Sequence, residues 1–344
     1  MVERDRLIAA LEDATHASSI HNSQPWRFRL VEGGVAVHLD PTVTPRTVDP
    51  VGRWALASIG AVVANLELAL TSRTGRAVVT EITLGDSIPE AADLAGGAAY
   101  GEGPLAVITL GEAAETTTAM TAARLHGAIK ERHTTRGPLL GGPPTEEEWA
   151  ELQAAVAWAP GIQATPASEP LVRSLLSLTA RAEDARQEDE DYLEEIQNWV
   201  ENEAPSGTGI PRGAIGAPDA EGHVPIRDFT QTPMGSSGDG EAVFFEDPPA
   251  LLVLHAASDT PVDQLRAGYA MQRAMLEATA LGLGIGVLGQ ALEEPDSRAA
   301  VDGAAEESFG APVVVHQILR LGHPAGTITY AATPRRPVTD LILD

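Results

Sequence analysis

The chain opens with two hydrophobic periods, first helical and then strand-like. Apolar residues recur at helical spacing over residues 4–17, which predicts an amphipathic helix. Over residues 26–30 aromatic and aliphatic side chains alternate with arginines, the period of a half-buried strand. Gly33 and Gly34 then predict a hairpin turn into a second strand at residues 35–39.

Similar patterns predict further elements along the chain. Helical spacing is found at residues 53–71 and 261–281, and from about residue 118 to Arg132. Short apolar runs predict strands at residues 78–84, 105–110, 250–255, 285–288 and 313–321. Because helices and strands mix without regular alternation, the pattern favours an α+β fold over a doubly wound parallel sheet.

Two of these helices indicate an internal duplication. Alanine, leucine and glutamate recur in the helices at 53–71 and 261–281 at a constant offset of 210 residues, although alanine-rich helices also resemble one another by chance. The helix ending near His16 matches the one ending near His133 at an offset of 117. We therefore expect a first half at residues 1–115 and a second at 116–344, the second carrying about 93 extra residues within 139–246.

The expected insertion has recognisable parts. Thr145 and Glu148 form a capping-box pattern at the start of a helix, and a long helical pattern follows at residues 168–199. The acidic run at 188–195 on that helix is typical of a solvated face. Residues 203–240 are rich in glycine, proline, serine and aspartate, and loops of that length are usually lids, binding segments or disordered.

Charge and composition narrow the function. The 344 residues carry a formal net charge of −26, which argues against nucleic acids and anionic membranes as partners but leaves a small anionic ligand open. The absence of cysteine excludes disulfides, thiolate metal sites and thiol nucleophiles, and the histidines lack metal-binding spacing. With a charged N-terminus and no uncharged apolar stretch of about 20 residues, the sequence predicts a soluble, cytoplasmic protein.

Polar side chains gather between the first helix and the first strand. Ser19, Asn22 and Gln24 offer donors and acceptors that suit a flat heteroaromatic ligand, although an ordinary polar loop has the same composition. Gly284 to Gly289 fits the pattern G-x-G-x-x-G, but a helix precedes it and a strand follows, the reverse of a dinucleotide site. Gly282 and Gly284 are better suited to a helix end, and the short strand that follows can bring bare backbone N–H groups close to a ligand.

Two arginine pairs are the candidate anion site. Arg132-His-Thr-Thr-Arg136 follows a helix, and Arg335-Arg336 lies near the end of the chain. Guanidinium groups bind phosphate oxygens bidentately, and two converging pairs would make a phosphate cradle in this acidic chain. The alternative is a helix end that carries basic residues favourable to the helix dipole.

Taken together, the motifs resemble the nitroreductase superfamily of FMN proteins, and within it the Acg-like branch, in which two nitroreductase-like halves are fused. Residues 22–28 are similar to the motif N-x-Q-P-W-x-F, and residues 132–136 to the phosphate motif R-x-[ST]-x-[RK]. Residues 268–284 resemble the central helix and following turn, and residues 335–337 the closing basic motif. Residues 139–240 are not covered by the resemblance.

The resemblance implies two fused α/β/α halves that form an intramolecular pseudo-dimer around FMN. Each half lacks a motif that the other supplies, so we expect one complete site. Ser19, Asn22 and Gln24 would contact the ring or ribityl chain. The motif at 132–136 would provide Arg132 for the phosphate, with His133 and Thr134 beside it. Arg335 or Arg336 would join Arg132 at the phosphate. Arg136 would tune the flavin at its pyrimidine edge, and backbone N–H groups near Leu288 and Gly289 would face the hydride-accepting nitrogen.

The resemblance leaves two functions of different class. One is hydride transfer from NADH or NADPH through FMN to a nitroaromatic, quinone or similar small acceptor, with no acid or base residue required. The other is an FMN-binding or storage protein with little turnover because a lid at residues 203–240 covers the flavin. A flavin-free scaffold is a third alternative. We expect a monomer that acts as a pseudo-dimer, with further dimerisation left open.

Overall fold

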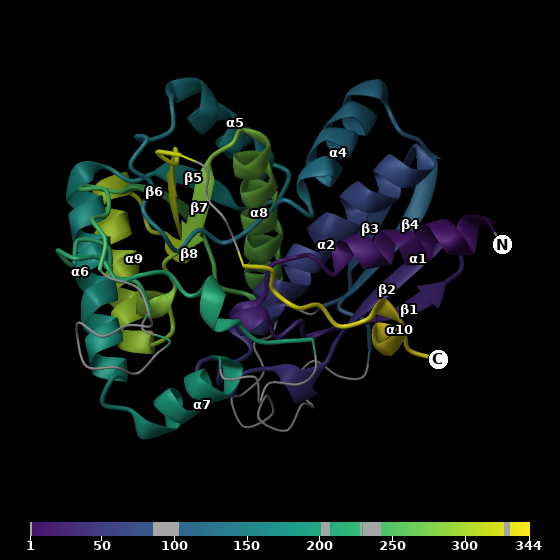
Figure 1. Ribbon diagram of the computed structural model, residues 1–344. Coiled ribbons are helices and arrows are strands. Elements are labelled where there is room, and N and C mark those ends of the chain that lie inside the picture. The colour runs from purple at the N-terminus through teal and green to yellow at the C-terminus, as the bar shows by residue number, and fades with distance from the viewer. Residues whose placement is uncertain (1, 85–102, 201–206, 228, 230–241, 327–330) are drawn as a thin grey trace.

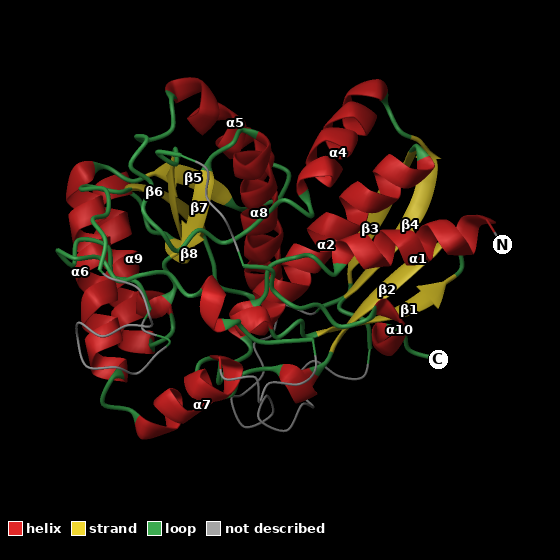
Figure 2. Cartoon of the chain, viewed as in Figure 1, coloured by secondary structure: helices red, strands yellow, loops and turns green. Residues whose placement is uncertain are grey.

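The computed structural model describes residues 2–84, 103–200, 207–227, 229, 242–326 and 331–344. Two four-stranded antiparallel sheets lie on either side of a central pair of helices, α2 (Arg53–Thr74) and α8 (Pro261–Ala280). Figure 1 shows the first sheet on the right and the second on the left, and Figure 2 shows the helices that cover them. The α+β class is confirmed.

The first sheet has the strand order β1-β2-β4-β3. Its strands are β1 (Trp26–Val31), β2 (Gly34–Leu39), β3 (Arg76–Ile82) and β4 (Ala106–Ala113). The predicted hairpin is confirmed: β1 pairs with β2 from Trp26↔Leu39 to Val31↔Gly34, and Gly33 takes a φ of 69° in the turn. Trp26 and Phe28 are fully buried, as the alternation predicts.

The second sheet repeats this order, β5-β6-β8-β7. Its strands are β5 (Gln163–Pro166), β6 (Ala250–Ala256), β7 (Gly284–Val287) and β8 (Val314–Gly322). Helix α1 (Val2–Ala14) precedes β1 as α5 (Glu146–Val156) precedes β5, and α2 connects β2 to β3 as α8 connects β6 to β7. The topology of the first sheet is therefore repeated in the second.

This correspondence differs from the expected one. Helix α5 and strand β5 fall inside residues 139–246, yet they occupy the places of α1 and β1 in the repeat. The helix before Arg132 is α4 (Thr116–Ala128), which is not the counterpart of α1. Between β5 and β6 the second half carries residues 167–249, where the first half has only the hairpin turn between β1 and β2. The match at an offset of 117 therefore pairs two helices that hold different places in the fold.

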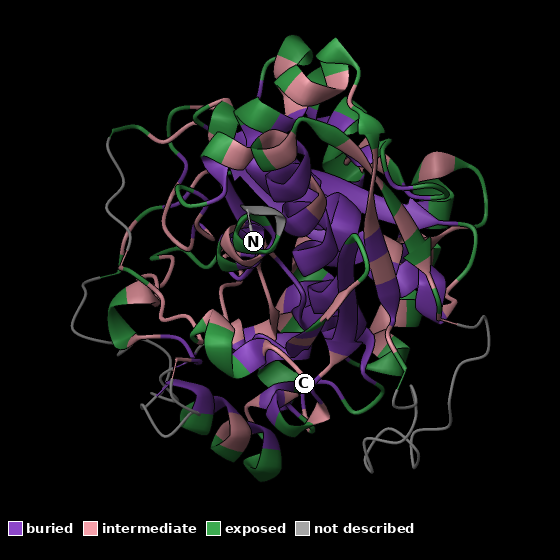
Figure 3. Cartoon of the chain, turned by 90° about the vertical axis from the view of Figure 1, so that its right-hand side faces the viewer, coloured by how far each residue is buried: buried purple, intermediate pink, exposed green. Residues whose placement is uncertain are grey.

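The two central helices cross at very short range. A Cβ atom on Gly60 would lie 1.8 Å from the carbonyl oxygen of Leu265, and one on Gly268 would lie 1.9 Å from that of Ala57. Only glycine allows these backbones to approach so closely. Most residues of both helices are buried, and Figure 3 shows buried segments at the centre of the molecule. By length and apolar composition α2 could span a membrane, but 89% of that window is buried in protein.

The remaining helices surround this centre. Helix α6 (Glu169–Arg186) packs against α9 (Pro295–Phe309), and α7 (Glu190–Val200) follows α6. The single helix predicted at 168–199 is thus two, because Asp189 interrupts it and accepts a hydrogen bond from the Tyr192 N–H at 3.1 Å. The acidic run is not entirely solvated, since Glu195 accepts hydrogen bonds from the backbone N–H groups of residues 46–48.

The capping box at the start of α5 is confirmed by reciprocal hydrogen bonds between Thr145 and Glu148. Short 3₁₀ turns complete the helices: η1 (Ile20–Asn22), η2 (Pro41–Val43), η3 (Arg212–Ala214) and η4 (Gln290–Leu292). Of the loop at 203–240, residues 203–206, 228 and 230–240 lie outside the described part of the chain.

The end of the chain returns to the first half. Helix α10 (Val338–Leu341) packs beside α1 and β1, and the Leu343 N–H donates to the Phe28 carbonyl at 2.7 Å. The tail that carries Arg335 and Arg336 therefore crosses from the second sheet to the edge of the first (Figure 1).

Candidate functional site

A cleft with two adjoining chambers lies where the halves meet. The first, here called the apolar chamber, is lined by residues that include Ile20, Trp54, Met271, Met275, Leu288 and Gly289. The second, the arginine chamber, is lined by residues that include Asn22, Arg132, His133, Thr333 and Arg335. Ser18, Ser19, His21, Thr134, Arg136 and Phe229 line both, so the chambers are continuous.

Both chambers take side chains from distant parts of the sequence. The α1–β1 connection supplies Ser19 and His21, and the segment after α4 supplies Thr134 and Arg136. The β7–η4 turn adds backbone to the apolar chamber, and the C-terminal tail adds Arg335 to the arginine chamber. The structure thus brings together Ser19, Asn22, Arg132, His133, Thr134, Arg136, Leu288, Gly289 and Arg335 from the predicted set.

The α1–β1 connection has an unusual backbone. His21, Asn22 and Gln24 have φ values of 47°, 55° and 53°. Non-glycine residues rarely adopt this left-handed region, and it persists only where the surroundings enforce it. The turn is enclosed by the inserted segment, since the His21 ring packs against the rings of Trp199 and Phe229 at centroid distances of 6.4 and 5.9 Å.

Three guanidinium groups at the arginine chamber have no carboxylate partner within the described residues: Arg132, Arg136 and Arg335. Arg132 is buried, and its Nε has no hydrogen-bond partner there. Burial and the neighbouring Arg335 lower the pKa of Arg132 to about 9. Burial lowers the pKa of Arg136 and of Arg335 to about 10. Each shift reports a cation removed from water without a counter-charge.

The surroundings of Arg132 supply only weak contacts. Its Nη2 donates to the His16 carbonyl at 3.4 Å, and its Nη1 lies 4.0 Å from the Met275 sulfur. Burial and the charge of Arg335 lower the pKa of the His16 side chain to about 4, so that imidazole stays neutral at pH 7. A buried cation held this loosely has free donors for an anion.

Two predicted site residues line neither chamber. Gln24 is fully buried and bonds to backbone, donating to Gly207 O at 2.6 Å and accepting from the Arg336 N–H at 3.0 Å. The Arg336 guanidinium is turned away and pairs with Asp40 at 3.1 Å. Of the two C-terminal arginines, only Arg335 reaches the arginine chamber.

In the apolar chamber the β7–η4 turn approaches Trp54. A Cβ atom on Gly289 would lie 3.1 Å from the Trp54 ring, so glycine keeps this contact close. The Leu288 N–H already donates to Ile318 O at 2.9 Å, whereas no described residue accepts from the Gly289 N–H. Gly289 is therefore the backbone donor that remains for a ligand.

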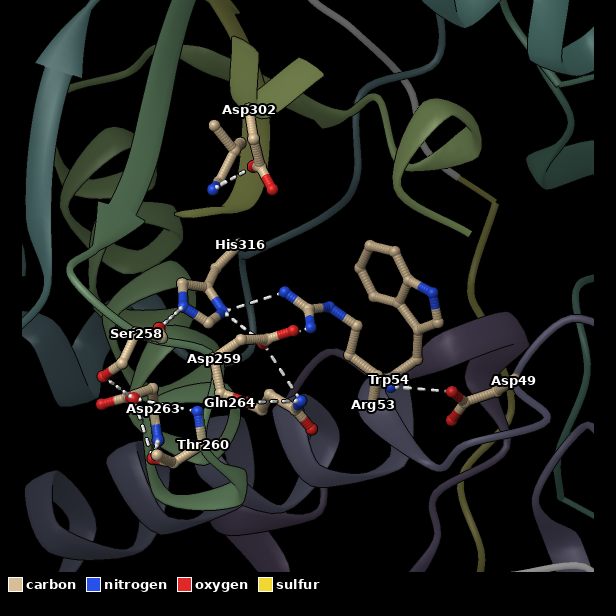
Figure 4. Close-up of polar contacts among 11 residues, drawn as sticks. Asp49, Arg53, Trp54, Ser258, Asp259, Thr260, Asp263, Gln264, Asp302 and His316 are labelled. Atoms are coloured by element: carbon tan, nitrogen blue, oxygen red, sulfur yellow. Dashed lines mark hydrogen bonds and ion pairs between the residues drawn. The ribbon is translucent and has the colours of Figure 1, made fainter. Parts of the chain in front are cut away.

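A polar cluster fixes the start of α2 and with it Trp54 (Figure 4). Asp49 accepts from the N–H groups of Trp54 and Ala55 at 3.1 and 2.8 Å. Arg53 forms an ion pair with Asp259 and donates to the His316 Nδ1 at 3.1 Å. The His316 Nε2 donates to the Ser258 carbonyl at 3.1 Å, which assigns a neutral tautomer. This cluster ties the first half to the loop before α8.

Sequence reasoning missed the residues that the inserted segment contributes. Arg227 lines the apolar chamber, donates to the Tyr192 hydroxyl at 2.8 Å and pairs with the buried Glu293. Phe229 lines both chambers, and the Arg136 guanidinium lies 5.6 Å from the centre of its ring. These residues carry no periodic signal because they lie in a loop. His21 lies next to Asn22 in the sequence, but only the fold shows that it lines both chambers and packs against Trp199 and Phe229.

Known proteins with similar sequences align with nearly the whole chain. "Putative NAD(P)H nitroreductase acg" of Mycobacterium tuberculosis strain H37Rv is 27% identical over 344 residues, which span 99% of this chain and 96% of that protein. A second "Putative NAD(P)H nitroreductase" of the same strain is 28% identical over 330 residues, 96% of this chain and 88% of that one.

Two solved structures align with lower similarity. A nitroreductase with bound FMN from Desulfitobacterium hafniense DCB-2 is 15% identical, covering 64% of this chain and 97% of that one, with a TM-score of 0.39. A BluB-like flavoprotein from Clostridium difficile 630 is 14% identical, covering 63% and 96%, with a TM-score of 0.39.

The sequence model of the nitroreductase family matches residues 129–323, more than half of the chain. This range includes Arg132, Arg136 and Gly289, and it ends before the tail that carries Arg335. The chain therefore belongs to the nitroreductase family.

Proposed function

We propose that the protein is an FMN-dependent oxidoreductase that uses NADH or NADPH to reduce a small acceptor such as a nitroaromatic or a quinone. The observation that carries this proposal is the arginine chamber, where buried guanidinium groups that have no carboxylate partner among the described residues adjoin an apolar chamber. Membership of the nitroreductase family supports the same reaction class.

The donors of the arginine chamber fit the phosphate of FMN. Arg132 and Arg335 each have a buried Nε without a partner among the described residues, and a phosphate dianion would supply the missing counter-charge. Guanidinium groups bind two phosphate oxygens at once. Thr134 would add a hydroxyl, and Ser19 would meet the part of the ligand that passes between the chambers. Arg336 has no part in this arrangement because it pairs with Asp40.

The apolar chamber fits a flat ring. A bound flavin would supply the two-electron chemistry, and the protein would orient it and adjust its electronics. Arg136 lies at the junction of the chambers, where its charge would favour the reduced, anionic ring. The free Gly289 N–H would donate to the ring edge, while Trp54 and Met275 exclude water.

The halves, proposed as residues 1–115 and 116–344, would together form one site within one chain. The α1–β1 connection, at residues 15–25, contributes Ser19 and His21 to the cleft, whereas the corresponding α5–β5 connection spans only residues 157–162. A second, symmetric site would lack such a connection. We therefore propose one FMN per chain, with no second chain needed to complete the site.

A protein that holds FMN with little turnover is the second candidate. The observation that favours it is the inserted segment, since Val224, Ile226 and Phe229 line the apolar chamber. The ion pair between Arg227 and Glu293 anchors that segment. If it stays closed, a nicotinamide donor cannot reach the ring.

Absorbance spectroscopy of the purified protein tests the proposal. We expect a flavin spectrum with one equivalent of FMN per chain, and two equivalents or no binding of added FMN would contradict it. Anaerobic mixing with NADPH, and separately with NADH, then distinguishes the candidates. Rapid bleaching supports the oxidoreductase, whereas flavin that stays oxidised with both donors but is reduced by dithionite supports the holding protein.

A further inference from the structure

We propose that Asn22 and Gln24 act as a clip that positions Arg335 for the phosphate, and that neither amide is a flavin contact. This inference rests on the proposed function. It assigns to the two residues a role different from the ring or ribityl contact that the family resemblance implies. The clip consists of the side-chain amides of Asn22 and Gln24 and the backbone groups they bind at residues 207–209 and 334–336.

The donors of both amides are already used within the protein. A primary amide has two N–H donors. The Asn22 Nδ2 donates to Gly209 O and to Pro334 O, both at 3.0 Å. The Gln24 Nε2 donates to Gly207 O at 2.6 Å and to Asn22 O at 3.3 Å. A ligand could receive a hydrogen bond from either amide only if that amide gave up one of these bonds within the protein.

The acceptors of the clip hold two consecutive residues of the tail. The Asn22 Oδ1 accepts from Arg335 Nη1 at 3.0 Å, and the Gln24 Oε1 accepts from the Arg336 N–H at 3.0 Å. The clip thus holds the tail at two points, which are the side chain of Arg335 and the backbone N–H of Arg336. The left-handed backbone at Asn22 and Gln24, with φ values of 55° and 53°, accompanies this arrangement.

Arg335 is anchored by one end of its guanidinium group. Its other hydrogen bonds, to Thr333 and to Pro334 O, also leave from Nη1. Its Nε is buried and has no partner within the described chain. The edge formed by Nε and Nη2 is therefore left for an anion, and this edge binds two oxygens of a phosphate.

The clip also decides which of the two arginines faces the chamber. With its N–H bound to Gln24, Arg336 extends to Asp40 at 3.1 Å, on the other side of the tail. Gly207 lies directly against this segment, because a Cβ atom there would be 2.8 Å from Arg335 O. Insertion, tail and α1–β1 turn are thus joined at one point next to the arginine chamber.

Comparing the affinities for FMN and riboflavin, which lacks the phosphate, tests the clip. The main variant is Asn22→Gly, because glycine keeps the left-handed backbone without strain while removing the amide. We expect FMN binding to weaken about 10-fold, the lower end for losing a charged hydrogen bond, and riboflavin binding to change less than 2-fold. Arg335→Ala should act in the same way, and the double variant should be no weaker than Arg335→Ala.

Ser23→Ala is the matched control, because Ser23 lies in the same turn but has an ordinary φ of −67° and takes no part in the clip. It should leave both affinities unchanged. If Asn22→Gly fails to fold, Gln24→Glu is the second variant. It retains an acceptor for the Arg336 N–H, loses the donors to Gly207 and Asn22, and should show the same loss confined to FMN.

Equal weakening of FMN and riboflavin in the variant would overturn the clip and identify a ring contact. Additive losses in the double variant would also overturn it, because Asn22 would then act independently of Arg335. Failure of the unmodified protein to bind FMN at all would instead overturn the proposed function, and the inference with it.

Discussion

Two regions of the molecule bury arginine in opposite ways. In the cluster at the start of α2, Arg53 pairs with Asp259 and donates to the neutral His316 (Figure 4). In the arginine chamber, Arg132 is buried to a similar extent, but among the described residues its guanidinium group has only the His16 carbonyl and the Met275 sulfur as acceptors. A compensated buried charge serves the fold, whereas an uncompensated one reduces stability until a ligand arrives.

The difference separates structural from functional residues in a protein with a net charge of −26. Carboxylates are abundant, yet no described one is paired with Arg132, Arg136 or Arg335, while Arg53 and Arg227 each have one. Charge alone does not distinguish these arginines. They differ in whether a described carboxylate is paired with them. Mutating a paired arginine and mutating an unpaired one should therefore have different effects.

The largest expected effect is on the paired cluster. Asp259→Ala leaves the Arg53 guanidinium buried without its partner, and we expect the free energy of unfolding to fall by about 3 kcal/mol, near the lower end for such pairs. Asp259 is 28% exposed, which moderates the loss. Denaturant unfolding measures it. The double variant Arg53→Met/Asp259→Ala should recover part of the stability, and a single-variant loss below about 1 kcal/mol would contradict the comparison.

The next effect is on the unpaired arginine. Arg132→Met keeps most of the side-chain length but removes the charge, and we expect FMN binding to weaken by about 1.5 to 3 kcal/mol. The ligand-free protein should be as stable as before, or more so, because an uncompensated charge has been removed.

Flavin-fluorescence titration and denaturant unfolding measure these two quantities separately. Arg53→Met is the comparison variant, in which we expect the loss of stability to exceed the change in FMN affinity. If Arg132→Met lost stability and kept its affinity, the assignment of the two regions would be reversed.

The smallest expected effect is a pH dependence in the Asp49 region. Burial raises the pKa of the Asp49 carboxyl from 3.8 to about 7, although two backbone N–H groups oppose the shift. The folded state therefore keeps a proton that the unfolded state releases. Its stabilising contribution is complete below pH 3.8 and is lost as the pH rises through 7.

Between pH 6 and 8 we therefore expect the free energy of unfolding to fall by about 1.4 kcal/mol, the energy equivalent of one pKa unit. Asp49→Asn retains one acceptor for the start of α2 and should remove the dependence. Thermal or denaturant unfolding of both proteins at pH 6 and 8 measures it. Parallel pH profiles for the two proteins would show that Asp49 is ionised throughout.

Local pattern predicted much of the fold. The α1 helix, the β1–β2 hairpin and the capping box at Thr145 depend on neighbours within a few residues, so their signals are in the sequence itself. The break at Asp189 and the four-residue strand β5 were missed, because both are decided by contacts with distant segments. The extent of the insertion was misjudged for the same reason.

The sequence predicted which residue types lie near the candidate site better than it predicted the contacts of each side chain. Ser19, Arg132, Thr134, Arg136, Gly289 and Arg335 line the cleft as expected, since short motifs specify which chemical groups are present. Motifs do not specify where each group is directed. Gln24 binds backbone, Arg336 pairs with Asp40, and Phe229 enters the cleft from a loop without any periodic signal.

The sequence by itself determined most of the helices and strands, the family resemblance and the residue types that an anionic, flat ligand requires. Tertiary structure alone decided which arginines are compensated and which are free, because ion pairs form between residues far apart in the chain. Arg53 meets Asp259 across 206 positions, and Asn22 meets Arg335 across 313. Such partners are selected by the packing of α2 against α8 and by the return of the tail, and neither leaves a local pattern.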